Sequence, residues 1–493
     1  MTIDDQKTLD PSDWEAFRAE GYAAVDQMVD HLSNVRERPL WRPMPDKVTS
    51  MPHEALPTAA TPLTEVVAEF KDKVMPYSNG NIHPRFWGWV QGAGSANGVI
   101  ADIYASMLNS NLGGRDHAAI YLERLVVNWM LKLFGMPKGA SGQLVTGTSM
   151  GTMLALVIAR NKALGIKDKS AGIRNIDQQL VAYTSAEAHF SVKKAMDVIG
   201  VGSKNLHIIP SNEQNEMDIA ALKQQISIDR AAGMVPFAIV AVAGAVNTGA
   251  IDPLSALADL CKAEKIWFHV DGAFGGLLVL SDDLKHKVTG IERADSVAFD
   301  FHKWMQVNYS VGTLLVRDET YHLESFASDQ AYLTIQGRGL AGGDKPWPNN
   351  YGVDLSRGFT ALKVWFQLKE HGVKNLAHVI EKNCAQAEWL EQQVIANNQL
   401  EMMQKVSLNI AVFRYIGANI LPNRLSEINK EIIFQLHEKG IAAPSETTVN
   451  GQVVIRVALC NHRTTKEDLS LLMSQVCRLG GEITLLKNDQ SMG

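Results

Sequence analysis

The 493-residue chain has few cysteines, no strong excess of charge of one sign and no long apolar run. Its four cysteines are Cys261, Cys384, Cys460 and Cys477. They show neither C-x-x-C nor zinc-type spacing, so they are expected to be reduced, mostly buried thiols of a cytoplasmic protein without a metal site. The net charge of −6 gives no reason to expect nucleic acid or an anionic membrane surface as a partner.

No segment has the features of a targeting or membrane-spanning sequence. The first residues, M-T-I-D-D-Q-K, lack a basic region followed by an apolar core, so no secretory signal is expected. The longest uncharged apolar run, Val235 to Val246, is too short for a bilayer and contains proline and glycine. We expect it to be a buried parallel strand. With 46% hydrophobic and 20% charged residues, the composition is typical of a soluble globular enzyme with a large core.

Lys303 lies between two segments with strand character, in the stretch S-V-A-F-D-F-H-K-W-M-Q-V-N-Y-S-V-G-T-L-L-V. The run from Val311 to Val316 is apolar enough for a buried strand. His302 and Trp304 flank the lysine, and bulky, weakly solvated neighbours disfavour an ammonium group, so its neutral amine is expected to be available as a nucleophile. The alternative is a lysine that reaches from an apolar segment to solvent.

Asp271 ends an apolar run in the stretch I-W-F-H-V-D-G-A-F-G-G. In α/β folds, ligands bind at the carboxyl ends of strands. The small residues Gly272 and Ala273 allow a flat ring to approach the backbone there. Pyridoxal phosphate requires a lysine for a Schiff base and an acidic partner for its ring nitrogen, and Lys303 and Asp271 could supply both. The alternative for Asp271 is an ordinary cap at the end of a strand.

The motifs H-V-D-G-A-F-G-G and D-F-H-K-W resemble the signature of group II pyridoxal-phosphate amino-acid decarboxylases. This family contains aromatic L-amino-acid, histidine and glutamate decarboxylases, and further matches run from about His83 to about Thr465. The resemblance implies an α/β fold of type I, like that of aspartate aminotransferase, with a central, mostly parallel seven-stranded sheet. It also implies pyridoxal 5′-phosphate as the cofactor, a role in amino-acid and carboxylic-acid metabolism, and a homodimer with active sites at the interface.

Three parts are expected along the chain. Residues 1–82 would form an N-terminal helical arm, with a helix from Asp13 to Arg36, an extended proline-rich segment from Pro39 to Pro62 and a helix from Leu63 to Lys73. By resemblance, this arm clasps the other subunit. Residues 83–373 would form the large cofactor-binding domain, and residues 374–493 a small C-terminal α/β domain.

A phosphate site is expected where the stretch Q-L-V-T-G-T-S-M-G passes from a short strand through a tight turn into a helix. Free backbone N–H groups and the positive end of the helix dipole at such a turn bind phosphate. We expect Thr148, Ser149 and Met150 to hold the phosphate of the cofactor, and the resemblance implies the same.

The same turn supports a rival hypothesis, because G-T-S-M-G matches the G-x-S-x-G motif of a serine hydrolase. Ser149 would then be the nucleophile, with His462 as a conceivable histidine partner. This hypothesis leaves Asp271 and Lys303 unexplained, whereas the cofactor hypothesis uses both.

Further residues around the cofactor are implied by the resemblance. His189 follows a predicted strand and would stack on the cofactor ring and position the substrate; alone, it could equally be a surface histidine. Asp300 stands where several relatives carry asparagine, and a carboxylate repels phosphate unless it is protonated or turned away. We therefore rank Asp300 below Ser296 and His302 as a phosphate contact. The other expected cofactor contacts are Ala273 and Val246.

The segment from Ser325 to Asn350 has no sustained apolar period and is expected to be a functional lid. Tyr332 aligns with the lid tyrosine of the family, which donates a proton to the carbanion left after carbon dioxide departs. Relatives that make aldehydes by oxidative deamination tend to carry phenylalanine there. The alternative is an exposed loop tyrosine.

The substrate pocket is expected near an aromatic cluster interleaved with glycine, where a flat side chain could fit. Its candidate residues are Trp87, Trp89, Gly92, Asn81 and Ser356. The predicted activity is decarboxylation of an L-amino acid with an aromatic or imidazole side chain to an amine and carbon dioxide. A pyridoxal-phosphate-dependent aldehyde synthase or aminotransferase is the alternative within the same chemistry.

Overall fold

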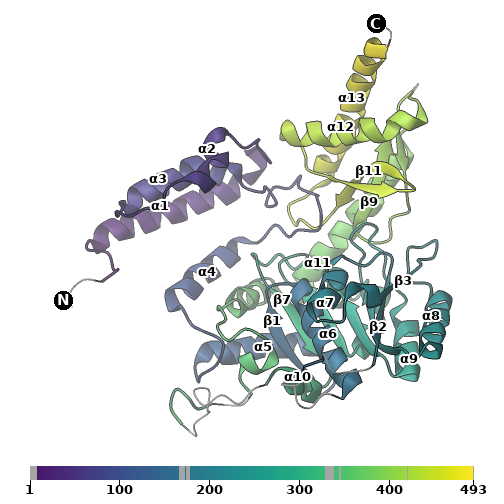
Figure 1. Ribbon diagram of the computed structural model, residues 1–493. Helices are drawn as coiled ribbons and strands as arrows, with labels where there is room; N and C mark the ends of the chain where they lie inside the picture. Colours follow the sequence, from purple (N-terminus) through teal and green to yellow (C-terminus); the bar gives the residue numbers. More distant parts are fainter. Residues whose placement is uncertain are drawn as a thin grey trace.

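The computed structural model of the chain describes residues 8–165, 172–173, 178–327, 338–343, 346–418 and 420–491. These residues form a seven-stranded sheet, a four-stranded sheet and a helical arm (Figure 1). The two sheets lie one above the other, and the arm projects to one side of both. Within the described part of the chain, no helix is both long and apolar enough to cross a membrane.

The large sheet has the order β1-β7-β6-β5-β4-β2-β3. Its strands run parallel to one another except for β7, which is antiparallel to β1 and β6. The α/β architecture with a mostly parallel seven-stranded sheet is therefore confirmed. The strands are β1 (Ser141–Val145), β2 (Leu180–Ser185), β3 (Leu206–Ile209), β4 (Val235–Val242), β5 (Trp267–Asp271), β6 (Ser296–Asp300) and β7 (Gly312–Val316).

Both faces of this sheet are covered by helices, which explains why its strands read as continuous apolar runs. In β4, Val240 packs into the core beneath α6, whereas its neighbour Ile239 packs into the core on the opposite face. One face carries α6 (Thr148–Leu164), α7 (Ser191–Val198) and α10 (Glu319–Phe326), and the other carries α5 (Ala118–Leu133), α8 (Ile219–Ala231) and α9 (Leu254–Glu264).

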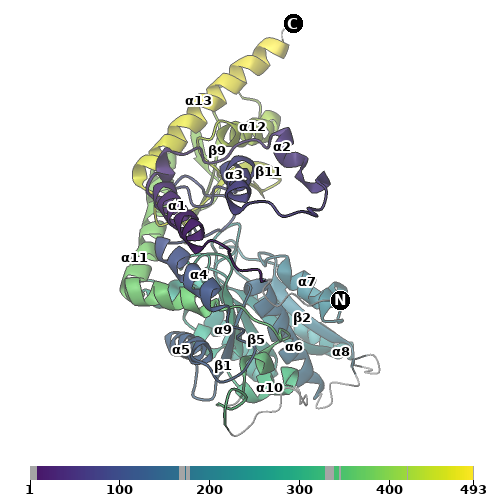
Figure 2. The same ribbon diagram turned by 90° about the vertical axis from the view of Figure 1, so that its left-hand side faces the viewer.

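A long helix, α11 (Ala361–Ile395), connects the large sheet to the small one (Figure 2). It is interrupted at Gly372, whose φ of 66° is easily adopted by glycine. The predicted boundary between residues 373 and 374 follows this interruption and stays a prediction. The predicted helix from Leu376 to Ala396 corresponds to the second half of α11.

The small sheet is antiparallel and has the order β10-β11-β9-β8. The predicted strands correspond to β9 and β11, whereas the short strands β8 and β10 were not expected. The elements are β8 (Leu400–Met402), β9 (Ile410–Tyr415), α12 (Leu425–Glu438), β10 (Ser445–Val449), β11 (Gln452–Ala458) and α13 (Lys466–Ser491).

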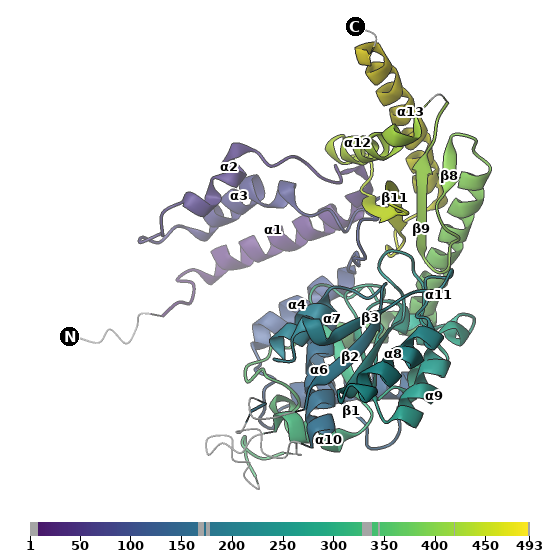
Figure 3. The same ribbon diagram turned by 45° about the vertical axis from the view of Figure 1, so that its right-hand side comes forward.

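The arm consists of α1 (Trp14–Ser33), α2 (Asp46–Thr49) and α3 (Leu63–Lys73), and α4 (Ala96–Leu108) follows it (Figure 3). The Asp13 side chain caps α1 by accepting from the backbone N–H groups of Glu15 and Ala16. The expectation of a fully extended proline-rich segment is wrong, because α2 and a 3₁₀ turn at Met51–His53 interrupt it. Neither α1 nor α3 buries a side chain against its own chain.

Candidate active site

A cavity of about 350 Å³ lies at the carboxyl ends of β4, β5 and β6. Asp271 is the last residue of β5, Asp300 is the last residue of β6, and α6 begins shortly after β1 ends. Because the carboxyl ends of parallel strands share one edge of a sheet, these residues converge there. The predicted site residues that line this cavity are Trp89, Thr148, Ser149, His189, Val246, Asp271, Ala273, His302 and Lys303.

Lys303 forms an ion pair with Asp300 at the centre of the cavity, with Nζ 2.9 Å from Oδ2. Burial alone would lower the pKa of Lys303, but the charge and hydrogen bond of Asp300, together with Asp271, raise it overall. The expectation that the neighbours of Lys303 disfavour its ammonium form is therefore wrong in this respect. Apolar neighbours are present, since Trp304 is buried, but the carboxylate dominates.

Asp271 is a buried carboxyl group on the floor of the cavity. Burial raises its pKa to about 6, although the charge of Lys303 and a hydrogen bond from the backbone N–H of Ala273 act in the opposite direction. The group is thus poised to exchange a proton near neutral pH. A cationic ring nitrogen placed beside it would favour the ionised carboxylate.

His189 lies between β2 and α7, with its ring held by Ser191. The backbone N–H of Ser191 donates to Nδ1 at 3.3 Å, and the Ser191 hydroxyl lies 2.8 Å from the same atom. Nδ1 therefore accepts hydrogen bonds, and the neutral ring carries its proton on Nε2. Burial and then the charge of Lys303 lower the pKa of His189, so that the ring is neutral at pH 7.

Two predicted cofactor contacts do not line the cavity. Ser296 is the first residue of β6 rather than the last, so it lies at the far end of the strand, where its hydroxyl accepts a hydrogen bond from Trp267 Nε1 and contacts His269. Met150 packs against the core beneath α6, and its backbone N–H donates to the carbonyl of Gly147. Neither residue is available to a phosphate in the cavity.

The expected substrate-pocket residues divide in the same way. Trp89 is 57% exposed and lines the cavity, whereas Trp87 is buried in the core of the small sheet and donates to Thr464 Oγ1. Ser356 is exposed and does not line the cavity. The aromatic cluster is thus partly core and partly cavity wall.

Gly92 and Asn81 brace the segment that carries Lys303. A Cβ atom at Gly92 would lie 2.3 Å from the carbonyl oxygen of His302 and 2.4 Å from that of Lys303, so a side chain does not fit. The Asn81 amide donates to the carbonyl of Gly92 at 2.9 Å. Their small and polar character therefore reflects packing behind Lys303 and carries no information about the substrate.

Arg456, from β11, was not singled out from the sequence. Its guanidinium is buried and donates to the backbone carbonyls of Trp89, at 3.0 Å, and Val246. Burial lowers its pKa to about 10. These contacts tie the small sheet to two walls of the cavity. The further lining residues that were not predicted include Val90, Gln91, Phe274 and Tyr309.

Two other expectations concern Tyr332 and the nucleophile role of Ser149. Tyr332 lies outside the described residues. The hydrolase alternative finds no support, because no hydrogen bond joins Ser149 to a histidine in the described chain, and His462 instead contacts the carbonyl of Gly94 at 3.1 Å. The described residues contain no cluster of histidine, cysteine and acidic side chains that could hold a metal ion.

The cavity fits pyridoxal phosphate. Lys303 supplies the amine, and Asp271 supplies a buried carboxylate for the ring nitrogen. At the start of α6, the buried hydroxyl of Thr148 has no hydrogen-bond partner, as expected for a group that awaits a phosphate oxygen. Asp300 has the wrong charge to bind phosphate. Its carboxylate also accepts a 2.6 Å hydrogen bond from the Thr148 N–H.

Comparisons with known proteins agree with this geometry. Residues 45–416 match the family model described as the pyridoxal-dependent decarboxylase conserved domain. The chain is 32% identical over 480 residues to an aromatic-L-amino-acid decarboxylase of Bacillus atrophaeus, which covers 96% of this chain and 97% of that protein. It is 29% identical over 473 residues to a histidine decarboxylase of Drosophila melanogaster, covering 93% of this chain and 54% of that protein.

The fold is also that of a solved relative. The structure of Oryza sativa TDC with PLP and tryptamine has a TM-score of 0.88 and 24% identity, covering 97% of this chain and 100% of the other. The chain therefore belongs to the pyridoxal-dependent decarboxylase family and is an enzyme that uses pyridoxal 5′-phosphate to remove the carboxyl group of an amino acid.

Proposed function

We propose that this enzyme converts an L-amino acid with an aromatic or imidazole side chain into the corresponding amine and carbon dioxide. The observation that carries the proposal is the wall of the cavity that contains Lys303. Trp89 is exposed at this wall, and Val90, Phe274 and Tyr309 line the cavity with it. Flat side chains pack favourably against such aromatic groups.

The charges of the cavity also favour a substrate with a neutral side chain. Apart from its two histidines, the described lining has Lys303 as its cation and Asp271 and Asp300 as its anions. Lys303 is engaged with Asp300, so a second carboxylate on the substrate would find no spare cation among these residues. The similarity to an aromatic-amino-acid and a histidine decarboxylase supports the same substrate class.

The cavity residues Lys303, Asp271, Thr148, Ser149 and His189 each have a defined task in the proposed reaction. When bound, pyridoxal phosphate accepts the electron pair of the breaking bond between Cα and the carboxylate. Lys303 holds the cofactor covalently, and Asp271 keeps a proton on the ring nitrogen. Thr148 and Ser149 bind the phosphate at the start of α6. His189, fixed by Ser191, orients the substrate.

The substrate proposal is tested by incubating the purified holoenzyme with a panel of L-amino acids and measuring released carbon dioxide and amine. We expect turnover of tryptophan, tyrosine, phenylalanine, 3,4-dihydroxyphenylalanine or histidine, and none of glutamate or aspartate. Turnover confined to acidic or small aliphatic amino acids would overturn the proposal.

Tyr332 is proposed to donate the proton that Cα receives after carbon dioxide has left. A decarboxylase and an aldehyde synthase differ at this step, so product analysis separates them. The wild-type enzyme is expected to form amine, and Tyr332→Phe is expected to shift products toward aldehyde. If Tyr332→Phe leaves products and rate unchanged, this role is wrong.

We further propose that the enzyme works as a homodimer in the cytoplasm. The arm supports the dimer, because α1 exposes Trp14, Phe17 and Tyr22, and α3 exposes Val66 and Phe70. Helices with unpaired apolar faces require a partner surface, and a second copy of the chain supplies one. The cytoplasmic location is supported by the four cysteines, which are free thiols.

A further inference from the structure

Gln306 lies three residues after Lys303, at the end of the turn that carries the lysine. Its backbone N–H donates to the Lys303 carbonyl at 3.2 Å, and only 2% of the residue is exposed. Its φ of 58° lies in the left-handed region, which favours glycine over residues with a side chain. The backbone conformation alone does not explain a buried glutamine at this position, so the reason has to lie in the contacts of its side chain.

The side chain of Gln306 joins segments that are distant in the sequence. Its Oε1 accepts a hydrogen bond from the backbone N–H of Ala93 at 3.0 Å, and its Nε2 donates to the carbonyl of Cys460 at 2.5 Å. The same Nε2 donates its second proton to the carbonyl of Trp304 at 3.3 Å. These partners determine the orientation of the amide, because a backbone N–H can only donate and a carbonyl can only accept.

The hydrogen bond to Ala93 holds the preceding residue, Gly92, against the backbone of Lys303. A Cβ atom at Gly92 would lie 2.4 Å from the Lys303 carbonyl oxygen, so the two backbones are in close contact. Gln91, just before Gly92, lines the cavity. The amide of Gln306 therefore couples the position of Lys303 to one wall of the cavity.

The hydrogen bond to Cys460 connects the same turn to the small sheet. Cys460 follows the last residue of β11, Ala458, by two positions. Close to it in the chain, His462 contacts the carbonyl of Gly94 at 3.1 Å, so the two segments that Gln306 binds are also joined to each other. The turn is thus held by both segments through a single side chain.

The other groups that fit the cofactor are placed by the large sheet. Asp271 ends β5, and Thr148 begins α6 shortly after β1. Lys303 instead lies beyond the end of β6, on the turn, so its distance from these groups depends on what holds the turn.

We propose that Gln306 is a positioning residue that places the amine of Lys303 for its reaction with pyridoxal phosphate. In this reaction the neutral amine attacks the aldehyde carbon, a C=N bond forms, and the aldehyde oxygen leaves as water with the two protons of the amine. A small misplacement of reacting groups lowers such a rate strongly. The inference rests on the proposed role of Lys303, but it does not depend on which amino acid is decarboxylated.

The test follows, by absorbance, the covalent capture of pyridoxal phosphate by the cofactor-free enzyme. Gln306→Met keeps the length of the side chain but removes its hydrogen bonds, and the rate constant of capture should fall at least tenfold. Pyridoxine 5′-phosphate lacks the aldehyde, so its dissociation constant reports the ring and phosphate sites alone and should stay unchanged. Gln306→Gly suits the φ of 58° and should slow capture to the same degree, which separates the side-chain contacts from backbone strain.

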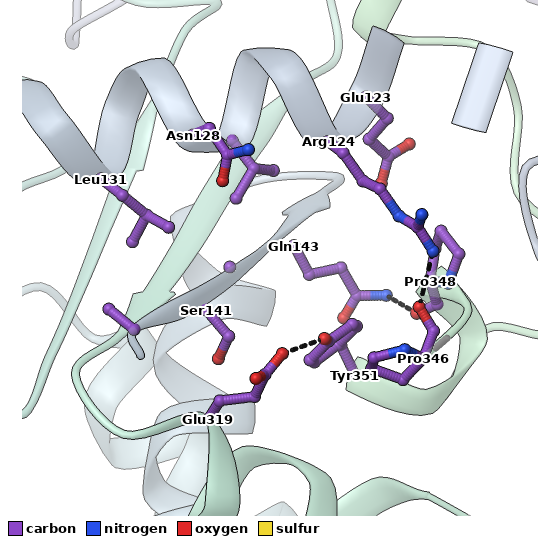
Figure 4. A pocket seen from close by; sticks show the side chains of 13 residues that line it. Glu123, Arg124, Asn128, Leu131, Ser141, Gln143, Glu319, Pro346, Pro348 and Tyr351 are labelled. Carbon is purple, nitrogen blue, oxygen red and sulfur yellow. Dashed lines mark hydrogen bonds between the residues drawn. The ribbon is translucent and has the colours of Figure 1, made fainter. Parts of the chain in front are cut away.

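Gln143→Met is the matched control for the loss of a buried glutamine. Gln143 is also 2% exposed, and its Nε2 donates to the carbonyl of Pro348 at 3.3 Å (Figure 4). It lines a second cavity, whose described lining residues differ from those of the cofactor cavity. This variant should lower the melting temperature as Gln306→Met does, yet capture pyridoxal phosphate at the wild-type rate.

Wild-type capture rates in Gln306→Met and Gln306→Gly would overturn the proposal and leave the role of Lys303 intact. Equal slowing in Gln143→Met would also overturn it, because the effect would then follow from stability alone. The same holds if the affinity for pyridoxine 5′-phosphate falls as much as the rate of capture. Covalent capture by Lys303→Ala would overturn the role of Lys303 and, with it, the proposal.

Discussion

The carboxylate of Asp300 bridges Lys303 and the first turn of α6. Its Oδ2 lies 2.9 Å from Lys303 Nζ, and its Oδ1 accepts a 2.6 Å hydrogen bond from the backbone N–H of Thr148. One side chain thus favours the ammonium form of the lysine and occupies an amide that a phosphate would otherwise use. A phosphate can take this amide only if Asp300 turns away or becomes protonated.

Replacing Asp300 with asparagine is expected to tighten cofactor binding. The variant keeps an oxygen for the Thr148 N–H, removes the charge that repels phosphate, and lowers the pKa of Lys303, so that more of its amine is neutral. Fluorescence titration of the cofactor-free enzyme should give a dissociation constant for pyridoxal phosphate that is at least tenfold lower in the variant. This corresponds to about 1.4 kcal/mol of binding free energy. Asp295→Asn, which is remote from Lys303, is the control. Unchanged or weaker binding in Asp300→Asn would contradict the prediction.

Asp271 is expected to make the stability of the cofactor-free enzyme depend on pH. Its pKa is raised from 3.8 to about 6 in the folded chain, so the folded state binds more protons than the unfolded state between these values. The contribution of Asp271 to the free energy of unfolding is therefore fully present below pH 3.8, and it is lost as the pH rises through about 6. Relative to Asp271→Asn, the wild type should lose up to about 3 kcal/mol of unfolding free energy across this window.

Urea unfolding of both proteins at a series of pH values measures this difference. The comparison with Asp271→Asn cancels the contributions of other titrating groups, such as Asp252. A difference that stays constant from pH 4 to pH 7 would show that Asp271 has an ordinary pKa in the folded chain.

Arg456→Met is expected to raise the KM for the amino acid more than it lowers kcat. The variant keeps an apolar stem but loses the hydrogen bonds to Trp89 and Val246, so both walls of the cavity become less well positioned. Arg414→Met, which removes an arginine of β9 paired with Glu401, is the control. Steady-state kinetics should show a rise in KM of about tenfold for Arg456→Met alone, and equal effects of both variants would argue against a positioning role.

The arm is expected to determine the oligomeric state. Phe17→Asp combined with Phe70→Asp places charges on the exposed apolar faces of α1 and α3 and should convert a dimer into a monomer with little activity. Arg18→Asp changes the charge on a neighbouring position of α1 without removing an apolar side chain. Light scattering after size-exclusion chromatography measures the mass. A dimer that survives the double substitution would contradict the proposed role of the arm.

The two strands that lead into the site could be predicted because their apolar runs are followed by residues with a chemical signature. Asp271 ends β5, and the segment of Lys303 lies between β6 and β7. Parallel strands bring such ends together, so residues distant in the sequence share one cavity. The short strands β8 and β10 escaped prediction, because three or five residues with little alternating apolar character carry a weak signal.

The parts of the site that could not be predicted depend on contacts between distant segments. Arg456 contacts Trp89 across 367 residues, and no local pattern marks such a pair. Ser296 was expected in the site with the residues that the resemblance implies, but it begins β6 and therefore lies at the opposite end of that strand from Asp300. The charge of Asp300 also reversed the pKa shift that apolar neighbours had suggested for Lys303.

Borohydride reduction of the holoenzyme followed by peptide mapping tests the cofactor site most directly. We predict a reduced pyridoxyl group on the peptide that contains Lys303, absent from Lys303→Ala, which should be folded but inactive. A pyridoxyl group on another lysine, or none on any peptide, would contradict the assignment of Lys303 as the residue that holds the cofactor.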